Sequence, residues 1–247
     1  MDEATDAPAA GRLTEYVEDG DHEAALAVLE QYERAAADRR QDALRELRGL
    51  ADDQPGAFPA VLSGLVPFLA DSERAVRLTT AKLFVAVADA ESAAVGAHSA
   101  PLVERLADDE EFYYVRARAA EALGYVARDE PEAVDTPTLL AELRVGLDFE
   151  EPEVVAKLSK ALSCVALGRP RRLAHHAPAL ADHLDDGDEL VRYYLTTALV
   201  AVGCERPAAL GDCRDALAAR LDDENGYVRG RAAEALGLLA RADNASV

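Results

Sequence analysis

The sequence predicts an all-α fold, an α-α superhelix of about six antiparallel helix pairs. The segment VRARAAEALG at 115–124 recurs 113 residues later as VRGRAAEALG at 228–237, with nine of ten positions identical. Looser copies begin at Val76, Val154 and Val191, so the aligned valines are 39, 39, 37 and 37 residues apart. A regular period of this length is typical of a helical repeat array, in which each unit buries its apolar face only against its neighbours.

The composition is strongly acidic and poor in large side chains. The chain carries 47 acidic against 26 basic residues, a net charge of −21, and has no Trp, one Met and five Phe. Only three of the basic residues are lysines. This pattern resembles the proteins of salt-in halophiles, so we interpret the protein as halophilic and haloarchaeal, with an acidic coat that keeps it dissolved. Nucleic acid is an unsuitable ligand, because phosphate binding needs a basic surface.

Cysteine usage and hydropathy indicate the compartment. Cys164, Cys204 and Cys213 are odd in number and lack CxxC spacing, which favours free thiols. No segment reaches the roughly 18 apolar residues of a membrane span, and the start, MDEATDAPAAG, lacks the features of a signal peptide. We therefore expect a cytoplasmic protein that does not contact a membrane.

The chain divides in order into a mobile acidic tail at 1–11, divergent amino-terminal capping helices at 12–54, five repeats at 55–241 and a carboxy-terminal tail at 242–247. Asp21 is expected to cap a helix after a break at Gly20. Each repeat is expected to hold an outer helix, a short acidic turn and an inner helix that opens on the aligned valine. The predicted outer and inner helices are 55–70 with 73–89, 93–107 with 112–128, 131–147 with 151–167, 170–184 with 188–204, and 207–221 with 225–241. Prolines near the outer starts, such as Pro55, Pro170 and Pro207, suit the first helical turn.

Helical periodicity assigns the faces of the inner helices. In the 115–128 helix it places Val115, Ala119, Ala122, Leu123 and Val126 in the core. It turns Ala117, Arg118, Glu121, Gly124 and Arg128 away from the core. The same register predicts two solvent-facing rows, Thr79, Arg118, Lys157, Tyr194 and Arg231, and Lys82, Glu121, Lys160, Thr197 and Glu234. Tyr114 aligns with Leu190 and Tyr227 and is predicted to be core, whereas Phe112 or Tyr113 is a candidate exposed partner edge.

An acidic turn followed by VRxxAAxALG resembles the HEAT-like repeats of the phycobilisome-lyase type. Residues 222–237 and 108–124 fit that pattern closely, residues 71–84 and 185–199 fit loosely, and residues 148–162 have lost the arginine. The resemblance covers about 55–241. It implies an armadillo-like helical solenoid that acts as a scaffold or binding surface, and it is specific for fold rather than for activity.

Recurring arginines are predicted at the second residue of the inner helices, where the helix dipole disfavours a cation. A compensating acid is therefore needed, and the resemblance implies a ladder of Arg and Asp that links neighbouring repeats. The predicted ladder residues are Arg77, Arg116, Arg192, Arg229, Asp71, Asp108, Asp185 and Asp222. Val155 replaces the arginine in the third repeat, so one rung is missing and the array is expected to bend or flex there.

The lysines indicate a binding face. All three fall on the outward rows of the inner helices, which line the concave side in such superhelices. Aromatic and basic residues are common anchors at protein interfaces. The predicted partner-binding residues are Lys82, Arg118, Tyr125, Lys157, Lys160, Tyr194 and Arg231. The alternative interpretation is an ordinary surface on which cations happen to lie, interrupted by Glu121 and Glu234.

The sequence predicts no catalytic, metal or cofactor site. The five histidines are scattered, the acidic turns lack the spacing of a calcium loop, and no catalytic triad order or phosphate-binding glycine loop occurs. The predicted function is thus a non-catalytic protein-binding scaffold or adaptor, a monomer whose partner is another protein. A lyase-like accessory role on a tetrapyrrole or other small ligand is the alternative, and a DNA-processing role conflicts with the charge.

Overall fold

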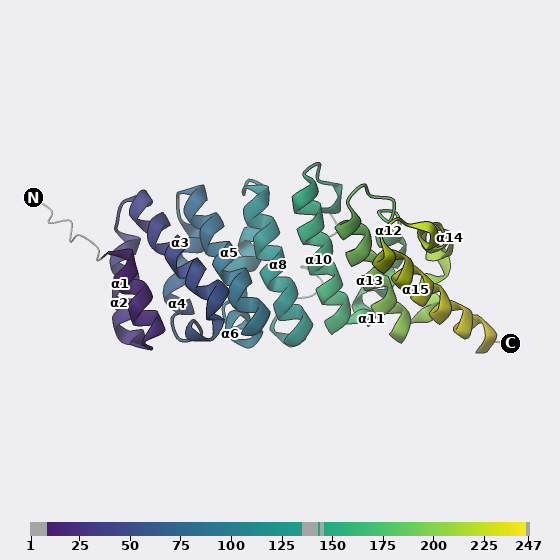
Figure 1. The fold of residues 1–247 in the computed structure, drawn as a ribbon, viewed down its shortest axis with the longest axis horizontal. Helices are drawn as coiled ribbons and strands as arrows, with labels where there is room; N and C mark the ends of the chain where they lie inside the picture. Colours follow the sequence, from purple (N-terminus) through teal and green to yellow (C-terminus); the bar gives the residue numbers. More distant parts are fainter. Residues whose placement is uncertain (1–8, 135–142, 144–145, 246–247) are drawn as a thin grey trace, which may run out of the picture. The chain divides into compact units, whose positions relative to one another are not determined.

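The computed structural model describes residues 9–134, 143 and 146–245, and these contain helices and no strand. The chain divides into two compact units, residues 1–126 and 127–247. Within each unit, long inner helices lie side by side and shorter helical segments connect them (Figure 1). The predicted fold class, an all-α solenoid of antiparallel helix pairs, is confirmed.

The first unit opens with α1 (Ala10–Glu18), α2 (His22–Glu33) and the inner helix α3 (Ala37–Asp53). Gly20 turns the chain between α1 and α2 with a φ of 73°, a conformation that glycine adopts without strain. The Asp21 side chain then accepts a hydrogen bond from the Ala24 N–H at 3.2 Å, which is the predicted cap. Since α1 begins at Ala10, helix reaches into the segment predicted as a tail.

The outer segments of the first unit are broken into short pieces. The first repeat holds η1 (Pro55–Ala57), α4 (Leu62–Leu65) and η2 (Val66–Ala70), which precede the inner helix α5 (Arg74–Ala90). The second repeat holds α6 (Ser92–Gly96) and α7 (Ser99–Ala107), which precede α8 (Tyr113–Asp129). A continuous outer helix over 55–70 was therefore the wrong expectation. Prolines at 55, 59 and 67 remove backbone donors along this stretch, which favours short turns over one helix.

The second unit repeats the plan. Its inner helices are α10 (Pro152–Gly168), α13 (Glu189–Glu205) and α15 (Gly226–Ala245). Its outer segments are η3 (Pro131–Ala133), η4 (Gly146–Asp148), α11 (Pro170–Leu173), η5 (Ala174–His176), α12 (Ala177–Ala181), η6 (Pro207–Cys213), α14 (Arg214–Ala219) and η7 (Arg220–Asp222). Most of the outer helix predicted at 131–147 lies outside the described residues. The last helix continues to Ala245, past the predicted boundary at 241.

The core follows the predicted periodicity, but the buried arc is wider. Val115, Ala119, Ala122, Leu123 and Val126 are fully buried, as predicted. Ala117, Glu121 and Gly124, expected to face solvent, are also buried, and so is Thr79 of α5. An inner helix packs on its own outer segments and on neighbouring inner helices, as α13 does against α11, α12, η6, α10 and α15. The buried part of an inner helix is therefore wider than the single apolar stripe from which the sequence analysis assigned the core.

The cysteines are free thiols, as predicted, with Cys164 and Cys213 buried and Cys204 exposed. Burial, reinforced by the nearby Asp212 and Asp182, raises the pKa of Cys213 to about 11. Of the helices in the described residues, none has the length and apolar character needed to cross a membrane.

Candidate functional site

In the second unit, Arg192 links two neighbouring repeats. It is the fourth residue of α13, and its Nη1 donates to the carbonyl oxygens of Asp186 and Gly187 at 2.8 and 3.2 Å. Its Nε and Nη2 donate to the carboxylate of Asp223, in the turn of the next repeat, at 2.8 and 3.1 Å. The two side chains are 6% and 2% exposed. One guanidinium fork thus holds its own turn and the following one together.

The first unit contains the same arrangement. Arg77, the fourth residue of α5, donates to the carbonyl oxygens of Asp71 and Ser72 at 2.8 and 3.1 Å. Its Nε and Nη2 bind the buried carboxylate of Glu111 at 2.7 and 2.8 Å. One repeat earlier, Arg40 of α3 pairs with Asp71 at 2.7 Å.

Paired arginines hold both linking carboxylates ionised. Burial alone would raise the pKa of Glu111, but hydrogen bonds from Arg77 and the Phe112 N–H, with the charges of Arg77 and Arg105, bring that pKa below its usual value. Burial would likewise raise the pKa of Asp223. Hydrogen bonds from Arg192 and the Asn225 N–H, with the charges of Arg192 and Arg220, outweigh burial and lower this pKa as well.

The ladder differs from the predicted one in register and in its acids. The arginine stands at the fourth residue of the inner helix, not the second, because each helix begins before its aligned valine. Of the predicted acids only Asp71 pairs with a ladder arginine, Arg40, whose role the sequence did not reveal. Asp108 caps its turn through the Glu110 N–H at 3.0 Å, while Asp185 and Asp222 are exposed.

The other two predicted ladder arginines bind backbone. Arg116 donates to the Leu106 carbonyl oxygen at 2.9 Å and approaches Asp109 at 3.6 Å. Arg229 donates to the carbonyl oxygens of Asp223 and Glu224 at 2.7 and 3.1 Å. All four predicted ladder arginines thus donate to backbone carbonyl oxygens at or beside the turn that precedes their own helix.

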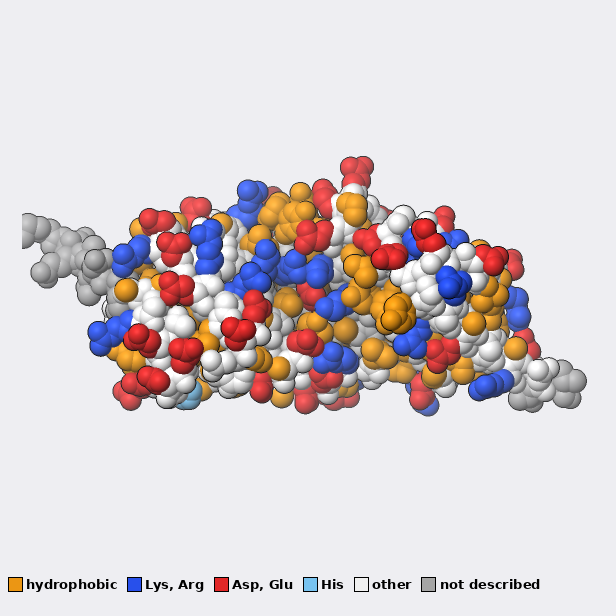
Figure 2. All heavy atoms as spheres, viewed as in Figure 1, with side chains coloured by type: hydrophobic (Ala, Val, Ile, Leu, Met, Phe, Trp, Pro, Cys, Tyr) orange, Lys and Arg blue, Asp and Glu red, His pale blue; other side chains and the backbone are white. Residues whose placement is uncertain are grey.

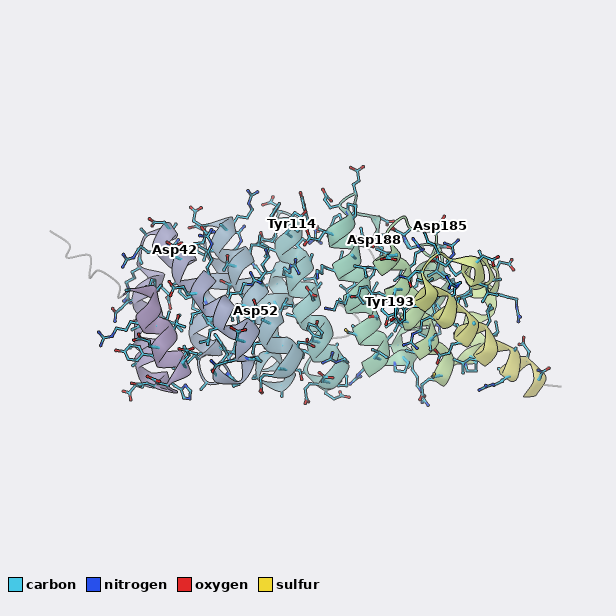
Figure 3. The ribbon with its side chains drawn as sticks, in the orientation of Figure 1. Asp42, Asp52, Tyr114, Asp185, Asp188 and Tyr193 are labelled. Carbon is cyan, nitrogen blue, oxygen red and sulfur yellow. The ribbon has the colours of Figure 1, made fainter. Side chains whose placement is uncertain are left out.

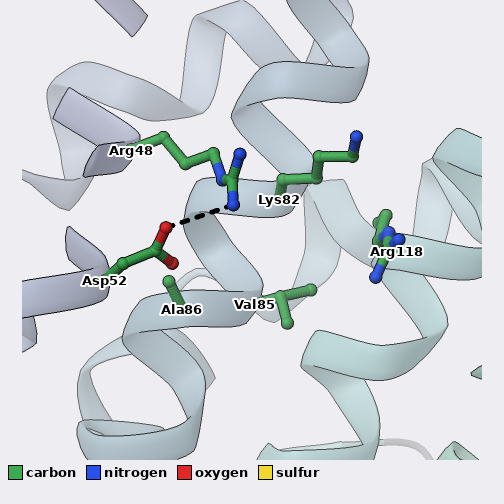
Figure 4. A pocket seen from close by; sticks show the side chains of 6 residues that line it. All are labelled: Arg48, Asp52, Lys82, Val85, Ala86 and Arg118. Atoms are coloured by element: carbon green, nitrogen blue, oxygen red, sulfur yellow. Dashed lines mark hydrogen bonds and ion pairs between the residues drawn. The ribbon is translucent and has the colours of Figure 1, made fainter. Parts of the chain in front are cut away.

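A cleft of about 180 Å³ lies on the inner-helix face of the first unit (Figure 4). Three successive inner helices contribute its lining, Arg48 and Asp52 from α3, Lys82, Val85 and Ala86 from α5, and Arg118 from α8. Figure 4 shows Lys82 between Arg48 and Arg118, with Val85 and Ala86 below. Arg48 pairs with Asp52 at 3.1 Å, and Arg118 pairs with the buried Glu121 at 2.9 Å. The cleft therefore combines three cations with a small apolar floor.

A second cleft, of about 360 Å³, adjoins the first. It is lined by Ala51, Asp52, Pro55, Val85, Ala86, Asp89, Ala90 and Tyr125, and shares Asp52, Val85 and Ala86 with its neighbour. Tyr125 is buried, which corrects the expectation of an outward contact residue. Only 7% of its surface is accessible, so it contributes a small part of the cleft lining.

The second unit presents tyrosines at the beginnings of α13 and α15. The ring centroid of Tyr193 lies 5.4 Å from that of Tyr194 and 6.2 Å from that of Tyr227. Tyr227 is 77% exposed and Leu190 is 48% exposed, and these are the residues with which Tyr114, predicted to be core, was aligned. Figure 2 shows apolar side chains gathered on this face over α13 and α15, where Figure 3 labels Tyr193.

The predicted binding residues are therefore divided between the units. Lys82, Arg118 and Tyr125 lie in the first, and Lys157, Lys160, Tyr194 and Arg231 in the second. Both lysines of α10 are half-buried. Arg231 binds Glu234 at 2.8 Å, and hydrogen bonding to Glu234 and to Tyr193 raises its pKa.

Phe112 and Tyr113, the candidate partner edge, form a packed aromatic cluster with Tyr114. Phe112, Tyr113 and Tyr114 are all half-buried, and their ring centroids lie 4.6 to 5.3 Å apart. The Arg74 guanidinium lies 4.4 Å from the centre of the Phe112 ring, a cation–π arrangement. Tyr114 is thus not a core residue, as the alignment with other repeats had suggested.

Metal-binding chemistry finds no support in the described part of the chain, which holds no group of three or more His, Cys, Asp or Glu able to bind an ion. Sequence comparison gives no family either, since no protein-family model and no curated protein matches the chain.

Engineered proteins, designed armadillo repeat proteins among them, are included in the solved structures with a similar fold. The designed armadillo repeat protein YIII(Dq)4CqI is 24% identical, with a TM-score of 0.72 over 85% of this chain and 98% of its own. A related designed protein, YIII(Dq.V1)4CPAF, was solved in complex with the peptide (KR)4, and is 23% identical with a TM-score of 0.72 over 85% and 97%. A further engineered protein is 20% identical, with a TM-score of 0.72 over 84% and 92%. This likeness establishes the helical-repeat fold alone.

Proposed function

We propose that this protein is a non-catalytic scaffold that binds a segment of a partner protein on its inner-helix face, with the cleft of Arg48, Lys82 and Arg118 as the main contact in the first unit. The observation that carries the proposal is this cationic cleft on a chain of net charge −21. A carboxylate of the partner is its complementary ligand.

The geometry suits close contact rather than long-range attraction. At roughly 1 M salt the Debye length is about 3 Å, so charges on a halophilic protein act only on groups that touch them. Arginine and lysine on adjacent helices converge over Val85 and Ala86, which offer a small apolar contact to the same ligand. A partner segment with an acidic side chain beside a small apolar one fits this lining.

Peptide binding is known for the fold, since the designed protein YIII(Dq.V1)4CPAF holds the peptide (KR)4. We extend to this chain only the principle that stacked inner helices present a surface to a peptide. Membership of the phycobilisome-lyase-like HEAT repeats and a haloarchaeal, cytoplasmic setting belong to the same proposal, supported by the VRxxAAxALG repeats and the acidic composition. The tetrapyrrole alternative has no support at this site, because neither first-unit cleft is lined by a histidine or a cysteine.

The test is recovery of partners from native cells at the salt concentration of the cell. The variant Arg48→Glu/Lys82→Glu reverses two charges of the cleft, and both side chains reach the surface, so the fold should persist. Arg45→Glu is the matched control, since Arg45 lies on the same helix, is largely exposed and pairs with Asp42 away from the cleft.

We expect one or more proteins to be recovered by wild type and by Arg45→Glu and to be lost with the double variant. Circular dichroism and melting of all three proteins must agree. If the double variant recovers the same partners as wild type, the cleft is ordinary surface and the proposal is wrong.

A further inference from the structure

We infer that a second binding surface, formed by Leu190, Tyr193, Tyr194 and Tyr227 and named the tyrosine surface below, takes an extended peptide segment in which lysine or arginine alternates with apolar residues. It lies wholly in the second unit and rests on observations independent of the first-unit cleft.

Repetition brings these side chains together. Leu190 and Tyr227 are the second residues of α13 and α15, and these two inner helices pack against each other. Tyr193 lies one turn beyond Leu190 and contacts the ring of Tyr227 edge-on, with an interplanar angle of 74°. The result is an apolar and aromatic strip across two repeats. Exposed large apolar side chains grouped in this way mark contact surfaces more often than scattered ones do.

The strip is held in place by polar contacts beneath and beside it. Asn225 accepts a hydrogen bond from the Tyr227 N–H at 2.8 Å and donates one to Glu189 of α13 at 2.8 Å. This side chain therefore caps α15 and ties its start to the start of α13. The hydrogen bond between Arg231 and Tyr193 holds the neighbouring side chains in the same way. Because these side chains are already ordered, binding a ligand costs them little conformational entropy.

The charge around the strip selects a cationic ligand. Asp188 and Glu189 precede Leu190, and the side chain of Glu224, three residues before Tyr227, is 91% exposed. Two neighbouring cations are paired with carboxylates, Arg192 with Asp223 and Arg231 with Glu234, and Arg192 also lies 3.8 Å from Glu224. Arg229 donates to the carbonyl oxygens of Asp223 and Glu224, so one cation faces the three carboxylates Asp188, Glu189 and Glu224. A lysine or arginine of a peptide thus meets carboxylates and tyrosine faces at once, which favours ion pairing and cation–π contact. Apolar side chains of the same peptide cover Leu190 and the ring edges.

A second copy of this chain is a poorer occupant. In a symmetric pair of copies, the carboxylates around the strip would come into direct contact with those of the other copy, and like charges at that distance repel even at high salt. An acidic peptide meets the same repulsion. The structure therefore commits the tyrosine surface to a basic, partly apolar segment.

The test uses a fluorescein-labelled synthetic peptide of alternating lysine and leucine, with an alternating glutamate and leucine peptide as the counterpart. Fluorescence anisotropy is measured at low and at molar salt. The variant Leu190→Ser/Tyr227→Ser removes two exposed side chains and leaves the core intact. Leu167→Ser is the matched control, because Leu167 is an exposed leucine, 54% accessible, on another inner helix, α10.

We expect the basic peptide to bind wild type and Leu167→Ser alike, and the double variant about tenfold more weakly, which corresponds to about 1.4 kcal/mol. Glu224→Gln is expected to weaken binding about threefold at low salt and less at molar salt, because ion pairing is screened. The acidic peptide should not bind any of these proteins.

Equal affinity of wild type and the double variant would show that the peptide binds the acidic coat as a whole, and would overturn the inference. Equal binding of the acidic peptide, or no binding of the basic peptide even at low salt, would overturn it too. The first-unit variant Arg48→Glu/Lys82→Glu should bind the basic peptide at least as well as wild type, so failure of the cleft proposal and failure of this one are distinguished.

Discussion

Replacing Arg192 with methionine should destabilise the second unit by about 3–5 kcal/mol. The change preserves an unbranched side chain but removes four hydrogen bonds, two to the Asp223 carboxylate and two to the carbonyl oxygens of Asp186 and Gly187. Asp223 is 2% exposed, so it is left as a buried carboxylate whose remaining cation is Arg220 at 3.5 Å. Breaking a buried pair from one side costs about 3–5 kcal/mol, because the other charge remains desolvated.

A double-mutant cycle measures the pair directly. Asp223→Asn retains an acceptor for the Asn225 N–H but removes the charge, so Arg192→Met/Asp223→Asn should be more stable than the sum of the single changes predicts, by about 2 kcal/mol. Arg214→Met is the control, since Arg214 pairs with Asp243 at 2.6 Å on half-exposed side chains and should contribute only about 0–1 kcal/mol. Stability is measured by urea denaturation monitored by circular dichroism. If Arg192→Met costs no more than Arg214→Met, the buried fork does not stabilise the repeat junction and the argument fails.

The pH dependence of the same variants gives a second readout. The pKa of Asp223 is lower in the folded state than its unfolded value of about 3.9, so its contribution is fully present above that value and is lost as pH falls through the folded pKa. Wild type should therefore lose stability below about pH 4 more steeply than Arg192→Met, in which the largest cause of the lowered pKa is removed and only the Asn225 N–H and Arg220 remain. Parallel curves for the two proteins would contradict this assignment.

Two further results are expected. Leu123→Ala should lower the free energy of unfolding by about 2–5 kcal/mol, because Leu123 is fully buried. Leu236→Ala should lower it by less, because Leu236, at the equivalent position of α15, is half-buried. An unchanged melting temperature of Leu123→Ala would mean that the helix register is wrong. The thiol of Cys213, with a pKa of about 11, should react with maleimide at pH 8 about a hundredfold more slowly than an ordinary thiol. The exposed Cys204 should therefore be labelled first. If peptide mass spectrometry finds the two cysteines labelled equally, the buried position of Cys213 is contradicted.

The inner helices and their core were predictable from the sequence because one periodic pattern determines both. Each aligned valine is buried and each inner helix begins close to the predicted residue. The outer segments were less predictable, since prolines at 55, 59 and 67 suit a helix start and a break equally well. Only packing against α5 decides how the chain turns there.

The partners of the arginines were not predictable from recurrence alone. Arg77 binds Glu111, four residues before Val115, whereas Arg192 binds Asp223, five residues before Val228. The turn before α8 carries two extra residues, so the acid that meets the arginine depends on how the turn folds. Each turn offers several acids, and a sequence pattern cannot rank them.

The tyrosine surface was predicted only in part, since Tyr194 was among the predicted binding residues but Leu190, Tyr193 and Tyr227 were not. The residue immediately before the aligned valine lies 100° from it on a helical wheel, among the positions assigned to solvent. Leu190 and Tyr227 served in the sequence analysis only to align Tyr114, which was interpreted as core, and were not considered as contact residues. Geometry was the better guide than residue type, since an apolar residue at an outward position is what a binding surface requires.

Val155 shows how a break in a repeat remains compatible with packing. It occupies the fourth position of α10, where the other inner helices carry the ladder arginine, and it is buried. Asp186, the equivalent of Asp223 in the next turn, is half-buried and accepts the Asp188 N–H at 2.7 Å. With an apolar residue at the arginine position and an acid that is not fully buried at the equivalent turn position, this junction avoids the cost of a buried unpaired charge, and such replacements are often neutral for stability. This repeat therefore lacks the arginine–carboxylate hydrogen bonds that join successive turns. The flexibility expected near α10 concerns the angle between repeats and not the stability of the helix itself. Hydrogen exchange at the turn before α13 that is as slow as at the turn before α15 would contradict that expectation.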